Sequence, residues 1–253
     1  MNEELVKVES WLSTNKLSLN LSKTTYILFR GKKQVRQFPS LYMYGNPISR
    51  VECTKFLGIF IDQNLNWKAH ANFVIGKLSR LNGILSKIGE NLNLNSLQTL
   101  YFSFFQPSLH YGIIFWFSVS KSLQNKIFRQ QKKAIRLINK SSFFAHTENL
   151  FRKNKILKFH DLYYLESCKF IYQEVNLCNN FHLVPHSSIH NYPTRSGSNL
   201  IPRSYRSLIG SNFVLSRGVT NYNNLSTRIK TLDSIDKFKC CLKLQLLAEY
   251  NSI

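Results

Sequence analysis

Acidic side chains are the first candidates for catalysis, because phosphoryl transfer with two metal ions requires at least two carboxylates that converge on the ions. The 253-residue chain has 13 Asp and Glu residues, and their spacing predicts no such cluster. The closest pairs are Glu3 with Glu4, and Asp233 with Asp236. Each pair lies at the start of a predicted helix, where acidic groups stabilise the helix dipole. Asp62 ends an apolar stretch and could be a metal ligand, but a carboxylate in that place is more typical of a turn.

Histidine and cysteine give a second candidate site. His182, His186 and His190 follow Cys178 at steps of four residues, a spacing that would suit zinc if the segment were helical. Pro185 opposes a helix there, and the chain has no second Cys/His pair at zinc-finger spacing. We therefore predict no metal site and no cofactor in this chain.

The pattern with the clearest chemical meaning is basic. Residues 120–140 have the periodicity of an amphipathic helix, whose core side is predicted to carry Leu123, Ile127, Ala134 and Ile138. Another side carries cations at steps of three and four residues, namely Lys126, Arg129, Lys133, Arg136 and Lys140. A basic face is often merely solvated. Here like charges repel at these spacings without any acidic residue to offset them, so we favour contact with a phosphate backbone.

The overall charge supports a polyanionic partner. Lys and Arg number 34 against 13 Asp and Glu, which gives a net charge of +21 and a pI near 9.9. Residues 63–140 contain 11 basic residues and one acidic residue, so this part of the chain is the electrostatic centre. The N-terminal residues include three Glu and no apolar run, which argues against a secretory signal.

Cysteine usage indicates the compartment. The chain has five Cys and no CxxC pair, which favours a reducing environment, so we expect an intracellular protein of the nucleus or cytoplasm. Cys240 and Cys241 lie within an apolar helical pattern and are predicted to be in the core. The apolar stretch 101–119 is interrupted by polar residues and Pro107, so we expect a buried helix pair bent at Pro107 and no membrane partner.

These patterns predict an α+β fold, with a small antiparallel sheet or hairpin near the N-terminus and a mainly helical remainder. Strands are expected at residues 25–29, 41–44 and 56–61, and a long loop at 185–206. Helices are expected at residues 5–15, 74–88, 97–104, 120–140, 161–175 and 234–250, the last with Ser234 as its N-cap. The predicted domains are 1–66, 67–140 and 141–253.

Several motifs occur in one order along the chain. The first two blocks are Trp11-Leu12 with residues 15–20 and Lys23-Thr24, and residues 56–59 with Ile61-Asp62. Further blocks are residues 107–112 with Trp116, residues 130–136, His146-Thr147, Tyr192 with Thr194-Arg195, and Phe238-Lys239. Over nearly its whole length the chain resembles non-LTR retrotransposon reverse transcriptases of the Jockey-like group. It departs from them at Tyr222, where Trp is common, and at Ser226, where Pro is common.

The resemblance implies the end of the palm in residues 1–66, the thumb in 67–140 and a C-terminal extension in 141–253. The catalytic carboxylates of these enzymes lie in palm motifs that precede the Trp11 segment, so Mg²⁺ is expected only for the complete polymerase. By position, Lys23 resembles the lysine that contacts the phosphates of the incoming nucleotide and donates a proton. Phe56, Leu57 and Gly58 resemble the primer grip, although Phe56 and Leu57 could equally be core residues.

Together these observations predict a fragment or remnant of a retrotransposon RNA-directed DNA polymerase. It would bind an RNA/DNA primer-template through the thumb helix and would have no polymerase activity by itself. A complete retroelement polymerase is a candidate protein partner. The alternative is a non-catalytic nucleic-acid-binding or interaction protein of retroelement origin.

Overall fold

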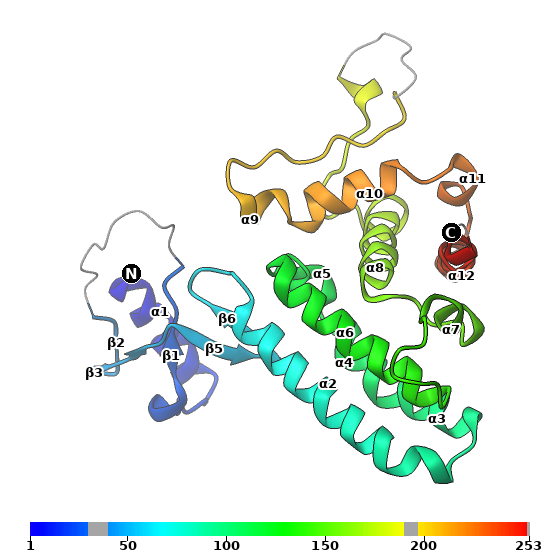
Figure 1. Ribbon diagram of the computed structural model, residues 1–253. Coiled ribbons are helices and arrows are strands. Elements are labelled where there is room, and N and C mark those ends of the chain that lie inside the picture. The colour runs from blue at the N-terminus through cyan, green and yellow to red at the C-terminus, as the bar shows by residue number, and fades with distance from the viewer. Residues whose placement is uncertain (30–39, 190–196, 252–253) are drawn as a thin grey trace. The chain divides into compact units, whose positions relative to one another are not determined.

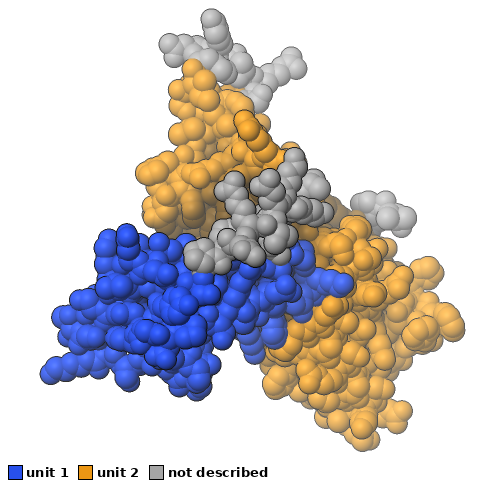
Figure 2. All heavy atoms as spheres, turned by 90° about the vertical axis from the view of Figure 1, so that its left-hand side faces the viewer, with its two compact units in different colours: residues 1–70 blue, residues 71–253 orange. Residues whose placement is uncertain are grey.

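The computed structural model describes residues 1–29, 40–189 and 197–251. The chain divides into two compact units, residues 1–70 and 71–253, which Figure 2 shows in different colours. The predicted α+β class is confirmed, with short strands near the N-terminus and helices in most of the remainder (Figure 1).

The described residues of the first unit form one α-helix, one 3-10 turn and six short strands. In chain order these are α1 (Asn2–Thr14), the 3-10 turn η1 (Leu21–Lys23), β1 (Thr25–Tyr26), β2 (Tyr42–Met43), β3 (Asn46–Pro47), β4 (Ser49–Arg50), β5 (Cys53–Phe56) and β6 (Ile59–Asp62). The pairs β2–β3 and β5–β6 are antiparallel, whereas β1 and β4 pair in parallel. The parallel pairing of β1 with β4 departs from the antiparallel arrangement that the sequence predicts.

Polar contacts hold α1 to the β2–β3 hairpin. The backbone N–H of Tyr44 donates to Oε1 of Glu9 at 2.6 Å, and the N–H of Tyr42 donates to Oδ1 of Asn2 at 3.3 Å. No side chain of α1 is buried, and the buried apolar side chains among the described residues of this unit are Leu41 and Met43. The described residues of the first unit therefore form a very small apolar core.

The second unit is helical, and its first helix, α2 (Lys68–Ile88), begins at the end of the first unit. The helices that follow are η2 (Gly89–Asn91), α3 (Leu94–Leu100), η3 (Tyr101–Phe105), α4 (Gln106–His110), α5 (Ile113–Trp116), α6 (Lys121–Ile138), α7 (Glu148–Lys153), α8 (Phe159–Gln173), η4 (Glu174–Cys178), η5 (His186–Ser188), α9 (Leu208–Ser211), η6 (Val214–Gly218), α10 (Val219–Asn223), α11 (Thr227–Lys230), α12 (Ile235–Ala248) and η7 (Glu249–Asn251). In the described residues no helix is both long enough and apolar enough to cross a membrane.

Helix α8 lies at the centre of the second unit, where it contacts α10 and α12 (Figure 1). Its N-terminal turn packs against large aromatic side chains of the segment that precedes α6. Phe159 stacks on Trp116 with ring centroids 5.7 Å apart, and Tyr163 stacks on Phe117 at 3.9 Å. All four side chains are buried, and because aromatic side chains bury a large area each, this cluster contributes strongly to the core.

The predicted bend at Pro107 is wrong in its position. The helical path continues from α3 through η3 into α4, and Pro107 lies in the first turn of α4. In η3 the N–H of Gln106 bonds to the carbonyl of Tyr101, a π-turn, and the proline that follows lacks an N–H. The chain breaks instead at Gly112, whose φ of 63° ends α4 and starts α5.

Two further expectations are corrected. Residues 56–61 form no single buried strand, because a two-residue turn at Leu57 and Gly58 joins β5 to β6. Cys240 is exposed and Cys241 is half-buried, so the pair is not in the core. The buried face of α12 contains Phe238 and Leu242, and Cys240 lies between them on another side of the helix.

Candidate nucleic-acid interface

Helix α6 is amphipathic, as its sequence predicts. The four side chains expected on its core side, Leu123, Ile127, Ala134 and Ile138, are all buried. Three further buried side chains widen this face, namely Gln124, Gln131 and Ile135. A strongly apolar face on one side leaves the cations on the other side exposed to solvent.

Gln131 fixes α6 to its neighbours from within the core. Its Nε2 donates to the hydroxyl of Tyr101 and to the carbonyl of Leu157, both at 2.9 Å, and its Oε1 accepts the N–H of Phe159 at 2.8 Å. Burial raises the pKa of Tyr101 well above its ordinary value, so the phenol stays neutral. The network locks the position of the helix that carries the cations.

The basic face consists of Lys126, Arg129, Lys133 and Lys140, all exposed, with Arg136 half-buried beside them. No ion pair or hydrogen bond joins Lys126, Arg129 or Lys133 to another side chain in the described part of the chain. Nζ of Lys140 donates to the carbonyl of Glu90 at 3.1 Å. The first three cations are thus available to an external anion.

Arg136 differs from the other cations of the face. Its Nε donates to the carbonyl of Ala145 at 2.9 Å, and its guanidinium lies 5.9 Å from the ring centroid of Phe143. Arg136 and Phe143 belong to the lining of a cavity of about 360 Å³ on the basic side of α6. The remaining lining residues are Arg129, Gln130, Lys132 and Lys133.

The other predicted nucleic-acid contacts lie in the first unit. Lys23 is exposed at the end of η1, two residues before Thr25 starts β1. Phe56 and Leu57 are 61% and 73% exposed at the tip of the β5–β6 hairpin, so the interpretation of these two residues as core is wrong. Gly58 has a φ of 85°, a conformation that favours glycine, and it completes the turn.

Asp62 serves as a turn residue. Its Oδ1 accepts the backbone N–H of Asn64 at 3.0 Å and of Asn66 at 3.3 Å, while Oδ2 accepts the N–H of Trp67 at 3.0 Å. Three backbone donors therefore stabilise this buried carboxylate and hold the segment that leads into α2.

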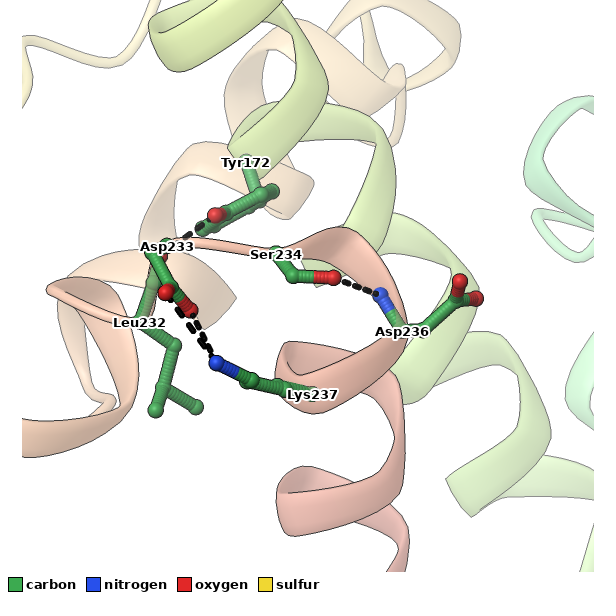
Figure 3. Close-up of polar contacts among 6 residues, drawn as sticks. All are labelled: Tyr172, Leu232, Asp233, Ser234, Asp236 and Lys237. Carbon is green, nitrogen blue, oxygen red and sulfur yellow. Dashed lines mark hydrogen bonds and ion pairs between the residues drawn. The ribbon is translucent and has the colours of Figure 1, made fainter.

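The acidic pair near the C-terminus also acts at a helix start (Figure 3). Both carboxylate oxygens of Asp233 accept from Nζ of Lys237 at 3.0 Å. The side chain of Ser234 accepts the backbone N–H of Asp236 at 3.3 Å, which confirms Ser234 as the N-cap of α12. The hydrogen bond and charge of Lys237 lower the pKa of Asp233 from its ordinary value.

The His/Cys pattern is spread along an irregular segment. Cys178 ends η4, His182 lies in the chain that follows, and His186 begins the short η5. His190 lies outside the described residues, as do the motif residues Tyr192, Thr194 and Arg195. Within residues 1–29, 40–189 and 197–251, no three His, Cys, Asp or Glu side chains come together in a way that could hold a metal ion.

Comparisons with known proteins agree with the motifs. The RNA-directed DNA polymerase from the mobile element jockey of Drosophila melanogaster is 24% identical over 165 residues, which are 64% of this chain and 18% of that protein. The probable RNA-directed DNA polymerase from transposon X-element of the same species is 25% identical over 154 residues, or 59% of this chain and 17% of that protein. This chain is similar to non-LTR retrotransposon reverse transcriptases.

A third relative supports the same group. The Pol polyprotein from the type-1 retrotransposable element R1 of Bradysia coprophila is 29% identical over 102 residues, which are 39% of this chain and 10% of that protein. The chain thus spans less than a fifth of the length of these retrotransposon relatives. No protein-family model matches it, and no solved structure matches it significantly.

Three features of the candidate interface were not predicted from the sequence. Lys132 belongs to the cavity lining and lies 4.7 Å from the ring centroid of Phe128, although it was not assigned to the basic face. The run of adjacent glutamines and lysines before Ala134 could have indicated it. The burial of Gln131 could not be predicted from the sequence, because residue type alone does not distinguish a buried glutamine from an exposed one. The aromatic pair Phe143-Phe144, which directly follows the basic helix, could also have been recognised in the sequence as a feature of this surface.

Proposed function

We propose that this chain is a nucleic-acid-binding part of a retroelement polymerase and that the basic face of α6 contacts the phosphates of a primer-template. The observation that carries the proposal is the set of exposed cations without acidic partners, Lys126, Arg129 and Lys133, on a helix fixed by buried Gln131. Similarity to RNA-directed DNA polymerases supports a template of RNA or DNA.

The contacts would be largely independent of base sequence. Lysine and arginine side chains on phosphates position a protein on a duplex but do not read base edges. Each neutralised phosphate releases counterions, so the affinity falls steeply as salt increases. A set of three fully available cations predicts a contribution of about three units to the log–log salt slope.

The test compares two variants with the same loss of charge. The interface variant replaces Lys126, Arg129 and Lys133 with Gln. The control replaces Lys153, Lys155 and Lys239 with Gln, three exposed lysines elsewhere in the same unit. Binding to a labelled blunt duplex is measured by fluorescence anisotropy between about 50 and 200 mM salt.

We expect the interface variant to lower the salt slope by about three units, while the control lowers it by less than one. Both variants should keep the circular dichroism and melting temperature of the wild type, because exposed substitutions usually change stability by within about 0.5 kcal/mol each. Equal loss in both variants would show that net charge, and not the α6 face, determines binding.

We also propose that the chain alone does not polymerise. Asp62, the last residue of β6, is held by three backbone N–H groups, an arrangement that supports a structural role. Mg²⁺ would then act only in a complete polymerase. Primer extension with Mg²⁺ or Mn²⁺ tests this, and template-dependent incorporation that is abolished by Asp62→Asn would contradict it.

In the first unit, we propose that Lys23 and the hairpin tip Phe56, Leu57 and Gly58 contact the primer-template. Their exposure supports this role, because two large apolar side chains at a hairpin tip gain little from the fold itself. The proposal for these residues is independent of the α6 face, and substitution at Leu57 tests it separately.

A further inference from the structure

A tight connection follows α6 and ends in two exposed aromatic residues. The N–H of Lys140 bonds to the carbonyl of Leu137, and the N–H of Ser141 bonds to the carbonyl of Arg136. Lys140 has a φ of 49°. This pattern is a Schellman motif, which ends the helix with a defined direction of the chain. The end of the helix therefore determines the direction of the residues that follow it.

The next four residues form a turn with an unusual composition. The N–H of Ala145 donates to the carbonyl of Ser142 at 3.1 Å, which places Phe143 and Phe144 at the two central positions. Glycine, proline, asparagine, aspartate and serine dominate such positions for conformational reasons that do not apply to phenylalanine. The turn itself gives no reason for two aromatic residues.

Burial gives no reason either. Phe143 is 72% exposed and Phe144 is 87% exposed, so most of both rings faces solvent. Their centroids are 5.3 Å apart with the planes at 90°. A planar group that stacked on one ring would lie parallel to that ring and perpendicular to the other.

The aromatic turn is held beside the cations. Nε of Arg136 donates to the carbonyl of Ala145, and the guanidinium lies near the ring of Phe143. Phe143 lines the same cavity as Arg129 and Lys133. Its volume of about 360 Å³ lies within the range of about 300–1,000 Å³ that small-molecule sites occupy. Cations and an aromatic ring thus share one surface.

We propose that the aromatic pair Phe143–Phe144 binds an unpaired base, with one ring stacking on the base, in a nucleic acid whose backbone lies on the basic face of α6. This inference rests on the proposed function of that face and specifies its ligand as a single strand or a single-stranded overhang. Stacking on an aromatic side chain accepts any base, and neighbouring cations hold the backbone in such sites. The Arg136 bond positions the turn so that both contacts are available together.

The experiment measures three labelled probes at one salt concentration, namely a blunt duplex, the same duplex with an unpaired overhang, and a single strand. Wild-type protein should bind the overhang probe more tightly than the blunt duplex by a factor between about 5 and 150, the range for stacking of one base. The double variant Phe143→Ala, Phe144→Ala should lose this preference and keep the affinity for the blunt duplex.

Two controls make the result specific. Phe143→Trp with Phe144→Trp should retain the preference, because indole also stacks on bases. Phe104→Ala, which removes a phenylalanine that is 56% exposed in η3, should behave as wild type. Since no charge changes, the salt slope of the alanine variant should equal that of the wild type.

A second readout reports stacking directly. An overhang that contains 2-aminopurine should change its fluorescence on binding to wild type and not on binding to the alanine variant. Equal affinity of the wild type for blunt and overhang probes would overturn the stacking inference while leaving the proposed function intact. If the wild type bound none of the three probes, both would fail.

Discussion

The two units of the chain use similar helical patterns in different ways. In the first unit α1 has apolar residues at helical spacing, yet Val8 and Trp11 are 44% and 58% exposed and the helix buries no side chain. In the second unit α6 buries seven side chains. Polar bonds from Asn2 and Glu9 hold α1, whereas dense packing around Ile127 and Gln131 holds α6.

This difference shows what determines the stability of each unit. Burial of apolar area is the dominant favourable term in folding, and exposed surface bonds contribute little by comparison. The second unit therefore provides a rigid support for the cations of α6. The first unit depends on a few polar contacts and turn residues, so its stability should respond weakly to apolar truncation and more strongly to changes in those contacts.

Truncation of an apolar side chain should give the largest difference in stability effect between α6 and α1. Ile127→Ala removes a fully buried side chain and is expected to cost about 2–5 kcal/mol in the unfolding free energy of the second unit. Val8→Ala on α1 should cost less than about 0.5 kcal/mol. Urea denaturation followed by the fluorescence of buried Trp116 measures the first effect, in a background with Trp11→Phe and Trp67→Phe. Similar costs at both positions would show that α1 is covered as well as α6.

Removal of a polar side chain should give the next largest difference in stability effect between the two units. Gln131→Ala leaves the groups on Tyr101, Leu157 and Phe159 without their partner, and we expect a loss of about 3 kcal/mol. Glu9→Ala removes one bond to the Tyr44 N–H at an exposed site and should cost at most about 1 kcal/mol.

A substitution on the same helix controls for local effects in this comparison. Asn125→Ala changes an exposed residue of α6 and should be neutral within about 0.5 kcal/mol. If Gln131→Ala were as mild as Asn125→Ala in chemical denaturation, water would have replaced the buried amide, and the support of α6 would be looser than the network indicates.

A fall in pH should destabilise the first unit through the protonation of His70. Burial lowers the pKa of His70 from its ordinary value of 6.5 to about 4, and its Nδ1 accepts the N–H of Phe60. The unfolded chain therefore takes up this proton first as the pH falls. Stability that is present above about pH 6.5 is lost progressively toward pH 4, where the folded form also becomes protonated.

The variant His70→Asn tests this effect, because the amide oxygen keeps an acceptor but does not titrate. The stability difference between wild type and variant should change by about 1–2 kcal/mol across that pH window, after allowance for partial solvent access. Denaturant midpoints measured from pH 7 to pH 4 give this difference. A constant difference would mean that His70 is protonated equally in the folded and unfolded states.

Much of the second unit could be predicted from its sequence because helical periodicity fixes which side chains share a face. The four apolar residues of α6 are buried as expected, and Ser234 caps α12. Periodicity does not locate breaks within an apolar run. The run that contains Pro107 breaks at Gly112 because a positive φ, and not the missing N–H of proline, ends α4.

The candidate site was only partly predictable for a related reason. Residue type places five cations on one side of α6, but it does not show that Arg136 bonds to Ala145. Nor does it identify the turn at Phe143 and Phe144, which lacks the usual turn residues. Both features depend on contacts between the helix end and the chain that follows, and such contacts have no periodic signature.

The smallest expected effect concerns Leu57, which was predicted to lie within a strand and instead lies in the turn between β5 and β6. Leu57 has a φ of 45° and is 73% exposed, whereas two-residue hairpin turns of this kind favour asparagine before glycine. Leu57→Asn should therefore stabilise the β5–β6 hairpin by about 0.5 kcal/mol, because asparagine adopts the left-handed conformation at lower cost.

The same substitution sharpens the comparison between the units. If the hairpin tip contacts the primer-template, Leu57→Asn should weaken binding of a primer-template probe although it stabilises the fold, and the salt slope of binding should stay unchanged. Leu17→Asn, at another exposed leucine of the first unit, is the matched control and should affect neither property. Wild-type affinity in the Leu57 variant would remove Leu57 from the proposed interface and leave the proposed contacts of the second unit unaffected.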